Sequence, residues 1–197
     1  MHILKSITLL GLSATLLLAT SQQNTKHTKS QKTVIQIGQQ STKLLLKTLG
    51  SNMKKKMKAG GPMKALDFCS TEAYTLTEKV NTELPNGVSI KRISTKFRNP
   101  INKPETNELK VLESLETLQK EHVALPKHLV QQVSKNVYKY YKPLVIKKQV
   151  CLKCHGDITN QKIKQAIAKK YPLDNAQHYK MGDLRGAVVV TIDKSKK

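Results

Sequence analysis

The sequence predicts an α+β protein with an antiparallel sheet, and the order of its patterns supports this fold class. Helical patterns come first, strand-like segments follow, and a further helical pattern lies between the strands. Hydrophobic residues make up only 38% of the 197 residues, which is thin for a self-sufficient core and leaves room for a large apolar cofactor. The composition excludes collagen, a coiled coil, a disulfide-dense mini-protein and a multi-span membrane protein.

The first half of the domain reads as two helices. A helix is expected from Val34, because apolar residues recur on one face, and it runs into the basic run at residues 53–58. Gly60-Gly61-Pro62 breaks this helix and opens a second one, which carries Cys69. The turn Pro85-Asn86-Gly87 ends the helical region.

The second half reads as strands around one more helix. Residues 88–97 alternate apolar and polar side chains like a half-buried strand, and residues 98–104 form a structured loop. An amphipathic helix follows, with an apolar face of Leu109, Leu112, Leu115 and Leu118. Residues 138–150 read as one or two β segments interrupted at Pro143, and residues 185–192 as a buried strand.

The N-terminus predicts export to the periplasm. A short positive start precedes the apolar run at residues 7–19, and small residues follow at the usual cleavage spacing. We therefore expect a cleaved signal peptide at residues 1–21, a flexible start at 22–33, one domain at 34–193 and a basic tail at 194–197. An uncleaved anchor helix is the alternative, although the run is short for a membrane span.

The charge predicts acidic partners. The chain has 35 Lys and Arg against 13 Asp and Glu, a net charge of +22. Because the protein is expected to be exported, we expect an acidic redox protein or a membrane-bound partner and no nucleic acid. Contact with an anionic membrane surface and a homodimer formed through the first helix remain open. The basic run with Lys54, Lys55, Lys56 and Lys58 is one candidate docking face.

Cys151-Leu152-Lys153-Cys154-His155 is the attachment signature of a c-type haem. Two thiols at this spacing can form thioethers with the two haem vinyl groups, and His155 then lies under the iron as a ligand. A thioredoxin-like pair gives the trailing His no role, and a zinc site needs two further ligands with similar spacing. The motif occurs once, so the sequence predicts one covalent haem c.

The second axial ligand is open from the residues alone. The candidates are Cys69, which is the one cysteine outside the motif, Met181, His178, or a vacant position. Met181 lies downstream of the motif, where small cytochromes often keep their distal ligand.

Several motifs in the same order resemble the periplasmic PAS-like single-haem c domains, which stand alone or form the sensor part of histidine kinases and chemotaxis receptors. The resemblance covers about residues 34–193. Besides the haem motif, it rests on these segments: Phe68-Cys69-Ser70-Thr71-Glu72-Ala73, Lys91-Arg92-Ile93-Ser94, Phe97-Arg98-Asn99-Pro100-Ile101-Asn102-Lys103-Pro104 with Glu108, Tyr141-Lys142-Pro143-Leu144, Tyr171-Pro172-Leu173-Asp174-Asn175-Ala176, and Met181-Gly182-Asp183-Leu184-Arg185-Gly186-Ala187.

The resemblance implies a PAS-like fold with long N-terminal helices and a five-stranded antiparallel sheet. It also implies iron held by His155 and Cys69. The chain departs from the family at Gln177-His178, where many relatives have Gly, and this makes His178 a candidate that they lack. Three arginines in the matching motifs are candidate partners of the haem propionates, with loop hydrogen bonding as the alternative: Arg92, Arg98 and Arg185.

Three functions are compatible with these features. We expect a periplasmic electron carrier first, because the chain reads as a stand-alone exported haem protein. A redox or diatomic-gas sensor module that signals through a separate partner is the second hypothesis. A haem enzyme such as a peroxidase is the third, and an axial Cys69 argues against it, so no enzymatic activity is predicted.

Overall fold

The computed structural model describes the main chain of residues 14–196 and the side chains of residues 31–196. Most of the predicted signal peptide lies in residues 1–13, outside the described part. The chain divides into two units, residues 1–33 and 34–197, and the second contains every strand of the sheet described below. Within the described residues, no helix combines the length and the apolar character that a membrane crossing requires.

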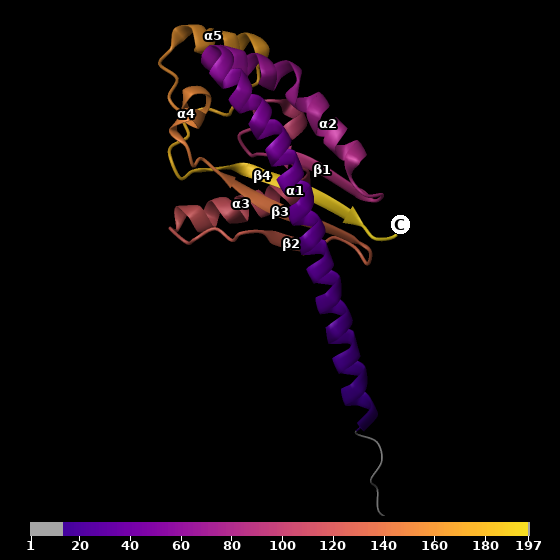
Figure 1. Ribbon diagram of the computed structural model, residues 1–197. Helices are drawn as coiled ribbons and strands as arrows, with labels where there is room; N and C mark the ends of the chain where they lie inside the picture. Colours follow the sequence, from indigo (N-terminus) through magenta and orange to yellow (C-terminus); the bar gives the residue numbers. More distant parts are fainter. Residues whose placement is uncertain (1–13, 197) are drawn as a thin grey trace, which may run out of the picture. The chain divides into compact units, whose positions relative to one another are not determined.

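The described residues form an α+β structure with a four-stranded antiparallel sheet in the order β1-β4-β3-β2 (Figure 1). The α+β prediction is confirmed, but the resemblance implied five strands, whereas residues 14–196 contribute four. The elements in chain order are α1 (Ala14–Thr71), α2 (Ala73–Glu83), β1 (Val88–Ile93), the 3-10 helix η1 (Pro100–Asn102), α3 (Thr106–Lys120), β2 (Leu129–Gln132), β3 (Val137–Val145), α4 (Gln149–His155), α5 (Gln161–Lys170) and β4 (Leu184–Asp193).

The predicted break in the first helical region is present inside α1. Gly60 has φ −174° and ψ 28°, and Gly61 has φ 65° and ψ −157°, so neither residue is helical. The positive φ of Gly61 is a conformation that only glycine adopts without strain. The kink lets the chain turn back at this point, and the segment after it carries Cys69.

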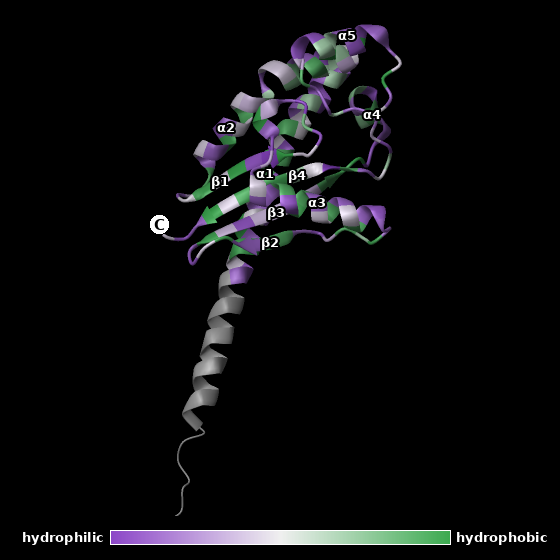
Figure 2. Ribbon diagram, turned by 180° about the vertical axis from the view of Figure 1, so that it is seen from behind, coloured by the Kyte–Doolittle hydropathy of each residue, from purple (hydrophilic) through white to green (hydrophobic). Residues whose placement is uncertain are grey.

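The sheet is covered on both faces. Residues of α1 and α2 pack against one face, where Val34, Phe68 and Val80 contact Ile90 and Tyr140. Gly38 of α1 lies so close to the Tyr140 ring that a Cβ there would come within 2.2 Å of it. Figure 2 shows hydrophobic and hydrophilic residues mixed along β1, β2 and β3, whereas β4, inside the sheet, carries the long apolar run Ala187–Val190.

α3 covers the other face and is anchored there by a buried carboxylate. Leu112 of α3 packs against Ile93 and Tyr141. Glu108, whose side chain is 0% exposed, accepts a hydrogen bond from Lys139 of β3 at 2.8 Å. Its carboxylate also completes the capping box of α3 by accepting the Glu105 amide.

Three details of the predicted strands are wrong. Pro143 does not interrupt β3, which is continuous and pairs this residue with Ala187 of β4. Since β2 pairs with β3 only as far as Tyr141, Pro143 lies where β3 has an open edge, and there a missing amide costs no ladder bond. The strand expected at residues 88–97 ends at Ile93, and residues 149–150, expected as β structure, begin α4.

Candidate functional site

The two motif cysteines and the motif histidine lie on one short helix, α4. Cys151 and Cys154 are three residues apart and therefore point from the same side of the helix. Both side chains are half-buried, and Cys151 packs against a small cluster of Ile146, Ala176 and Tyr179. α4 ends at Gly156, whose amide bonds back to Leu152.

The ring of His155 is fixed in one tautomer. Its Nδ1 lies 3.0 Å from the carbonyl oxygen of Ala176, and because a carbonyl can only accept, Nδ1 carries the proton. Burial, and after it the neighbouring cations Arg185 and Arg98, lower the pKa of His155 to about 3. The imidazole is therefore neutral at pH 7, with the lone pair on Nε2, which is the form that ligates a metal.

The Ala176 carbonyl is held in place by an ion pair between distant loops. Arg98 Nε and Nη2 donate to the two carboxylate oxygens of Asp174 at 3.0 and 3.1 Å. Arg98 Nη2 also donates to the Cys154 carbonyl at 2.6 Å and to the Ala176 carbonyl at 3.1 Å. One guanidinium thus connects α4, the loop before β4 and the loop after β1.

Asp174 orders its own loop as well. It accepts hydrogen bonds from the Ala176 amide at 2.8 Å and from Gln177 Nε2 at 2.9 Å. Burial opposes ionisation of this carboxyl, but the hydrogen bonds from Arg98 and the Ala176 amide outweigh it and lower the pKa. Asp174 is therefore an anion at neutral pH.

Cys69 belongs to the electrostatic neighbourhood of this site. Burial raises the pKa of its thiol, and the charges of Arg92 and Arg98 lower it. The pKa of Cys154 responds in the same way, first to burial and then to Arg98 and Cys69. The Cys69 residue keeps exposed surface, although surrounding elements desolvate its thiol.

The structure distinguishes the three candidate arginines. Arg98 is committed to Asp174 and two carbonyls, which matches the alternative of loop hydrogen bonding. Arg185 donates from Nη1 to Ser94 Oγ at 2.8 Å, and its guanidinium lies over the Tyr179 ring at 5.2 Å. Arg92 differs, because its Nε is buried with no hydrogen-bond partner in the described part of the chain.

The two other candidate axial ligands have different surroundings. Met181 is 43% exposed. The side chain of His178 is 74% exposed, and its Nδ1 lies 2.5 Å from Asp157 Oδ1. Cys69 is the candidate whose thiol interacts electrostatically with Cys154.

Sequence reasoning missed the residues that support His155. Asp174 and Ala176 were noted only as part of a matching segment, and Tyr171 and Tyr179 were given no role. Tyr171 is buried, which raises the pKa of its phenol to about 12, and its ring lies 6.0 Å from the Arg98 guanidinium. An aspartate two residues before a loop amide, which is an Asx-turn pattern, was the available signal.

The donor set fits a covalently attached haem. The site offers two half-buried thiols on one helix face and a neutral imidazole with its Nδ1–H engaged, and the thiol of Cys69 interacts electrostatically with Cys154. Arg92 adds a buried N–H without a partner, which suits a carboxylate. These residues could hold the macrocycle at its vinyl groups, its iron and a propionate.

Fold and site together define an α+β protein with an antiparallel sheet, whose motif cysteines and motif histidine lie on one short helix. Residues 13–193 match the Tll0287-like family (Tll0287), and the chain belongs to this family. Its structure is similar to the crystal structure of the cyanobacterial heme-protein Tll0287, with 20% sequence identity and a TM-score of 0.57; the match covers 86% of this chain and 98% of that chain. No curated protein matches the chain.

Replacing Asp174 by Asn should destabilise the protein by about 3 kcal/mol at pH 7, because Arg98 is left as a buried cation without an anionic partner. The measurement is the free energy of unfolding from denaturant titration. Asp157→Asn is the matched control, since Asp157 lies at an exposed pair, and should cost well under about 1 kcal/mol. Equal losses in both variants would contradict the structural role of the Arg98–Asp174 pair.

The same ion pair predicts a pH dependence. The folded-state pKa of Asp174 lies below the unfolded value of about 3.9. Its contribution is therefore complete above about pH 5 and is lost as the pH falls through the folded pKa. The free energy of unfolding should decrease less steeply below pH 4 in Asp174→Asn than in the parent protein.

Proposed function

We propose that the protein is an exported c-type cytochrome of PAS-like fold that carries one covalent haem and transfers electrons in the periplasm. The observation that carries the proposal is the neutral His155, held through Nδ1 directly after two cysteines on one helix. The family membership and the fold similarity to a cyanobacterial heme-protein support it. Haem, when bound, supplies one-electron redox chemistry.

Each residue of the site has a defined task in this proposal. Cys151 and Cys154 form the thioether attachments, and His155 offers Nε2 as the axial ligand. Cys69 is the second axial ligand, because its thiol interacts electrostatically with Cys154 of the haem motif. Burial raises the pKa of this thiol, and the charges of Arg92 and Arg98 partly offset that rise. Arg92 provides an unused N–H to a propionate.

A sensor of redox state or of a diatomic gas is the second candidate function. The resemblance to PAS-like haem domains that form the sensor part of histidine kinases and chemotaxis receptors favours it, and signalling would then pass through a separate partner. We do not propose an enzyme, because an axial Cys69 fills the position that peroxidase chemistry needs.

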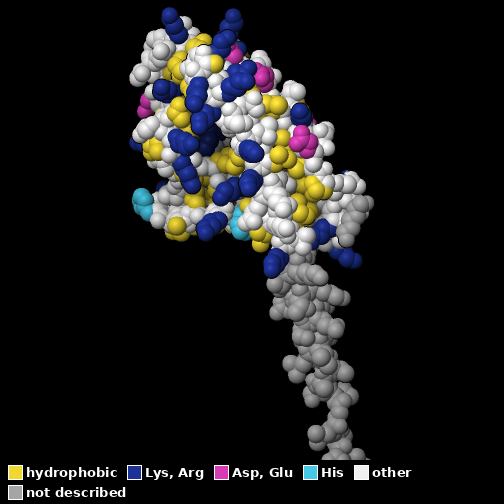
Figure 3. All heavy atoms as spheres, viewed as in Figure 1, with side chains coloured by type: hydrophobic (Ala, Val, Ile, Leu, Met, Phe, Trp, Pro, Cys, Tyr) yellow, Lys and Arg dark blue, Asp and Glu magenta, His cyan; other side chains and the backbone are white. Residues whose placement is uncertain are grey.

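The partner we propose is an acidic redox protein that docks near α4. Lys147, Lys148 and Lys153 are exposed before and on this helix, beside the attachment cysteines. Figure 3 shows Lys and Arg side chains gathered on one face with few Asp and Glu among them. In the basic run of α1, Lys56 is paired with Glu72 at 2.6 Å, so that run has fewer free charges than expected.

The cofactor is tested by haem staining of a denaturing gel. The mature protein, produced in a host with cytochrome c maturation, should retain one haem after denaturation and acid–acetone extraction. Cys151→Ala combined with Cys154→Ala should release the haem, whereas Cys69→Ala should keep it. A parent protein with no stained band would refute the proposal.

Cys69→Ala should shift the ferric spectrum and raise the reduction potential, because a thiolate stabilises the ferric form. The upward shift should be on the order of 100 mV, within the roughly 0.8 V range that axial ligands span. Electron paramagnetic resonance and redox titration measure both effects. His178→Ala and Met181→Ala are the controls and should leave spectrum and potential nearly unchanged; the reverse result would move the ligand to one of those residues.

Lys153→Glu should slow electron exchange with an acidic redox protein about tenfold at low salt, because opposite charges accelerate encounter. The difference from the parent should shrink at physiological salt, where the Debye length is about 8 Å. Lys55→Glu on α1 is the matched control for an exposed lysine away from α4. Stopped-flow rates that do not change with salt or with Lys153→Glu would exclude docking at α4.

A further inference from the structure

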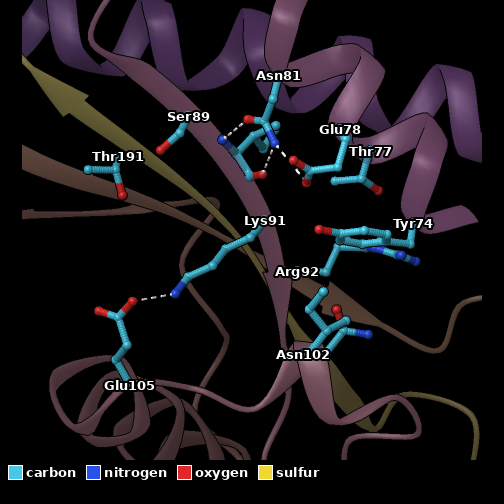
Figure 4. A pocket seen from close by; sticks show the side chains of 12 residues that line it. Tyr74, Thr77, Glu78, Asn81, Ser89, Lys91, Arg92, Asn102, Glu105 and Thr191 are labelled. Atoms are coloured by element: carbon cyan, nitrogen blue, oxygen red, sulfur yellow. Dashed lines mark hydrogen bonds and ion pairs between the residues drawn. The ribbon is translucent and has the colours of Figure 1, made fainter.

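A pocket of about 370 Å³ lies beside the edge strand β1 (Figure 4). Its walls come from α2, β1 and η1, and none of its lining residues belongs to α4. Its volume is in the range of pockets that take small ligands, roughly 300–1,000 Å³. The haem proposal gives this pocket no role.

On the open edge of β1, one residue directs its main-chain amide and carbonyl into the pocket. Asn81 of α2 caps Ile90, donating to its carbonyl at 3.1 Å and accepting its amide at 2.7 Å. The Ser94 amide donates to the Asn102 carbonyl at 3.1 Å. Alternate residues of an edge strand direct their main-chain groups outward, so the amide and carbonyl of Arg92, between these two caps, face the pocket. One residue with free main-chain groups can bind a small molecule, but it is too short an edge for an added peptide strand to pair with.

Two opposite charges in this pocket have no partner of opposite charge within residues 31–196. Lys91 and Glu105 neutralise each other at 2.7 Å. Glu78, in contrast, forms no salt bridge and has only the Asn81 amide at 3.4 Å. Arg92 lines the pocket as well, and it forms no salt bridge in these residues. The pocket therefore offers one anion and one cation that are not paired with each other or with neighbours.

The pocket also has exposed apolar walls. Tyr74 of α2 is 47% exposed and Ile101 of η1 is 51% exposed, and both line it. Figure 4 shows the Tyr74 ring and the Arg92 side chain on the same side of the pocket, with Glu78 further along α2. A matching ligand has a carboxylate for Arg92, an ammonium group for Glu78 and an apolar side chain for Tyr74 and Ile101.

We propose that this pocket binds a free α-amino acid with an apolar side chain. The guanidinium of Arg92 binds the carboxylate, and Glu78 binds the ammonium group. Arg92 also borders the haem site, but a guanidinium has five N–H donors and can serve a carboxylate on each side. The proposal does not depend on the cofactor, because pocket and charges belong to the protein alone.

The test compares three related probes by isothermal titration calorimetry on the purified, haem-loaded protein. L-Phenylalanine has both charged groups, 3-phenylpropionate lacks the ammonium group, and phenethylamine lacks the carboxylate. L-Phenylalanine should bind saturably, and each of the other two at least about tenfold more weakly, because a charged hydrogen bond is lost. Equal affinities, or no saturation by L-phenylalanine in the millimolar range, would overturn the proposal.

Two variants assign the two contacts. Glu78→Gln should remove the preference for L-phenylalanine over 3-phenylpropionate, and Arg92→Gln the preference over phenethylamine. Glu83→Gln and Lys79→Gln, at exposed positions of α2 that do not line the pocket, are the controls and should bind like the parent. Glu78 is exposed, so its variant remains informative even if Arg92→Gln does not fold.

The haem-free Cys151→Ala/Cys154→Ala protein separates the two sources of a carboxylate at Arg92. Binding of L-phenylalanine to both forms supports the proposal. Binding to the haem-free form alone would show that a propionate occupies Arg92, and would overturn it. The haem stain reports the cofactor independently, so failure of one proposal is distinguishable from failure of the other.

Discussion

The site depends on the buried ion pair between Arg98 and Asp174. It joins the loop after β1 to the loop before β4, and the same guanidinium holds the Cys154 carbonyl at the end of α4. A buried pair contributes little net stability against an apolar replacement, but loss of one partner is costly. The pair therefore acts mainly by geometry: it fixes the Ala176 carbonyl, and that carbonyl fixes the tautomer of His155.

The sequence predicted those features of the fold and the site that depend on residues close together in the chain. The α4 thiols and His155 lie within five residues, and the strand at β4 and the helix at α3 follow from local periodicity. The support of His155 could not be predicted, because Arg98 meets Asp174 across 76 residues of sequence. The continuity of β3 through Pro143 was also missed, since it depends on where the short β2 ends.

Burial and the nearby arginine charges both shift the pKa values of the side chains around the site. Burial disfavours charge on every group there, and it lowers the pKa of His155 while it raises that of Cys69. The nearby arginines add to the effect on the imidazole but oppose the effect on the thiol, because a cation disfavours imidazolium and favours thiolate. One set of cations thus keeps His155 neutral and partly offsets the effect of burial on the Cys69 thiol, whose pKa stays raised.

Several of the few acidic residues form ion pairs that hold helices and loops of this basic chain in place. With 13 Asp and Glu against 35 Lys and Arg, each acid can be matched to a cation. Glu108 forms a buried ion pair with Lys139 that anchors α3, and Asp174 forms one with Arg98 that anchors the loop beside His155. Glu72 pairs with Lys56. Glu78 and Arg92 line the same pocket, and neither forms a salt bridge in the described part of the chain, so this pocket keeps one anion and one cation available for a ligand.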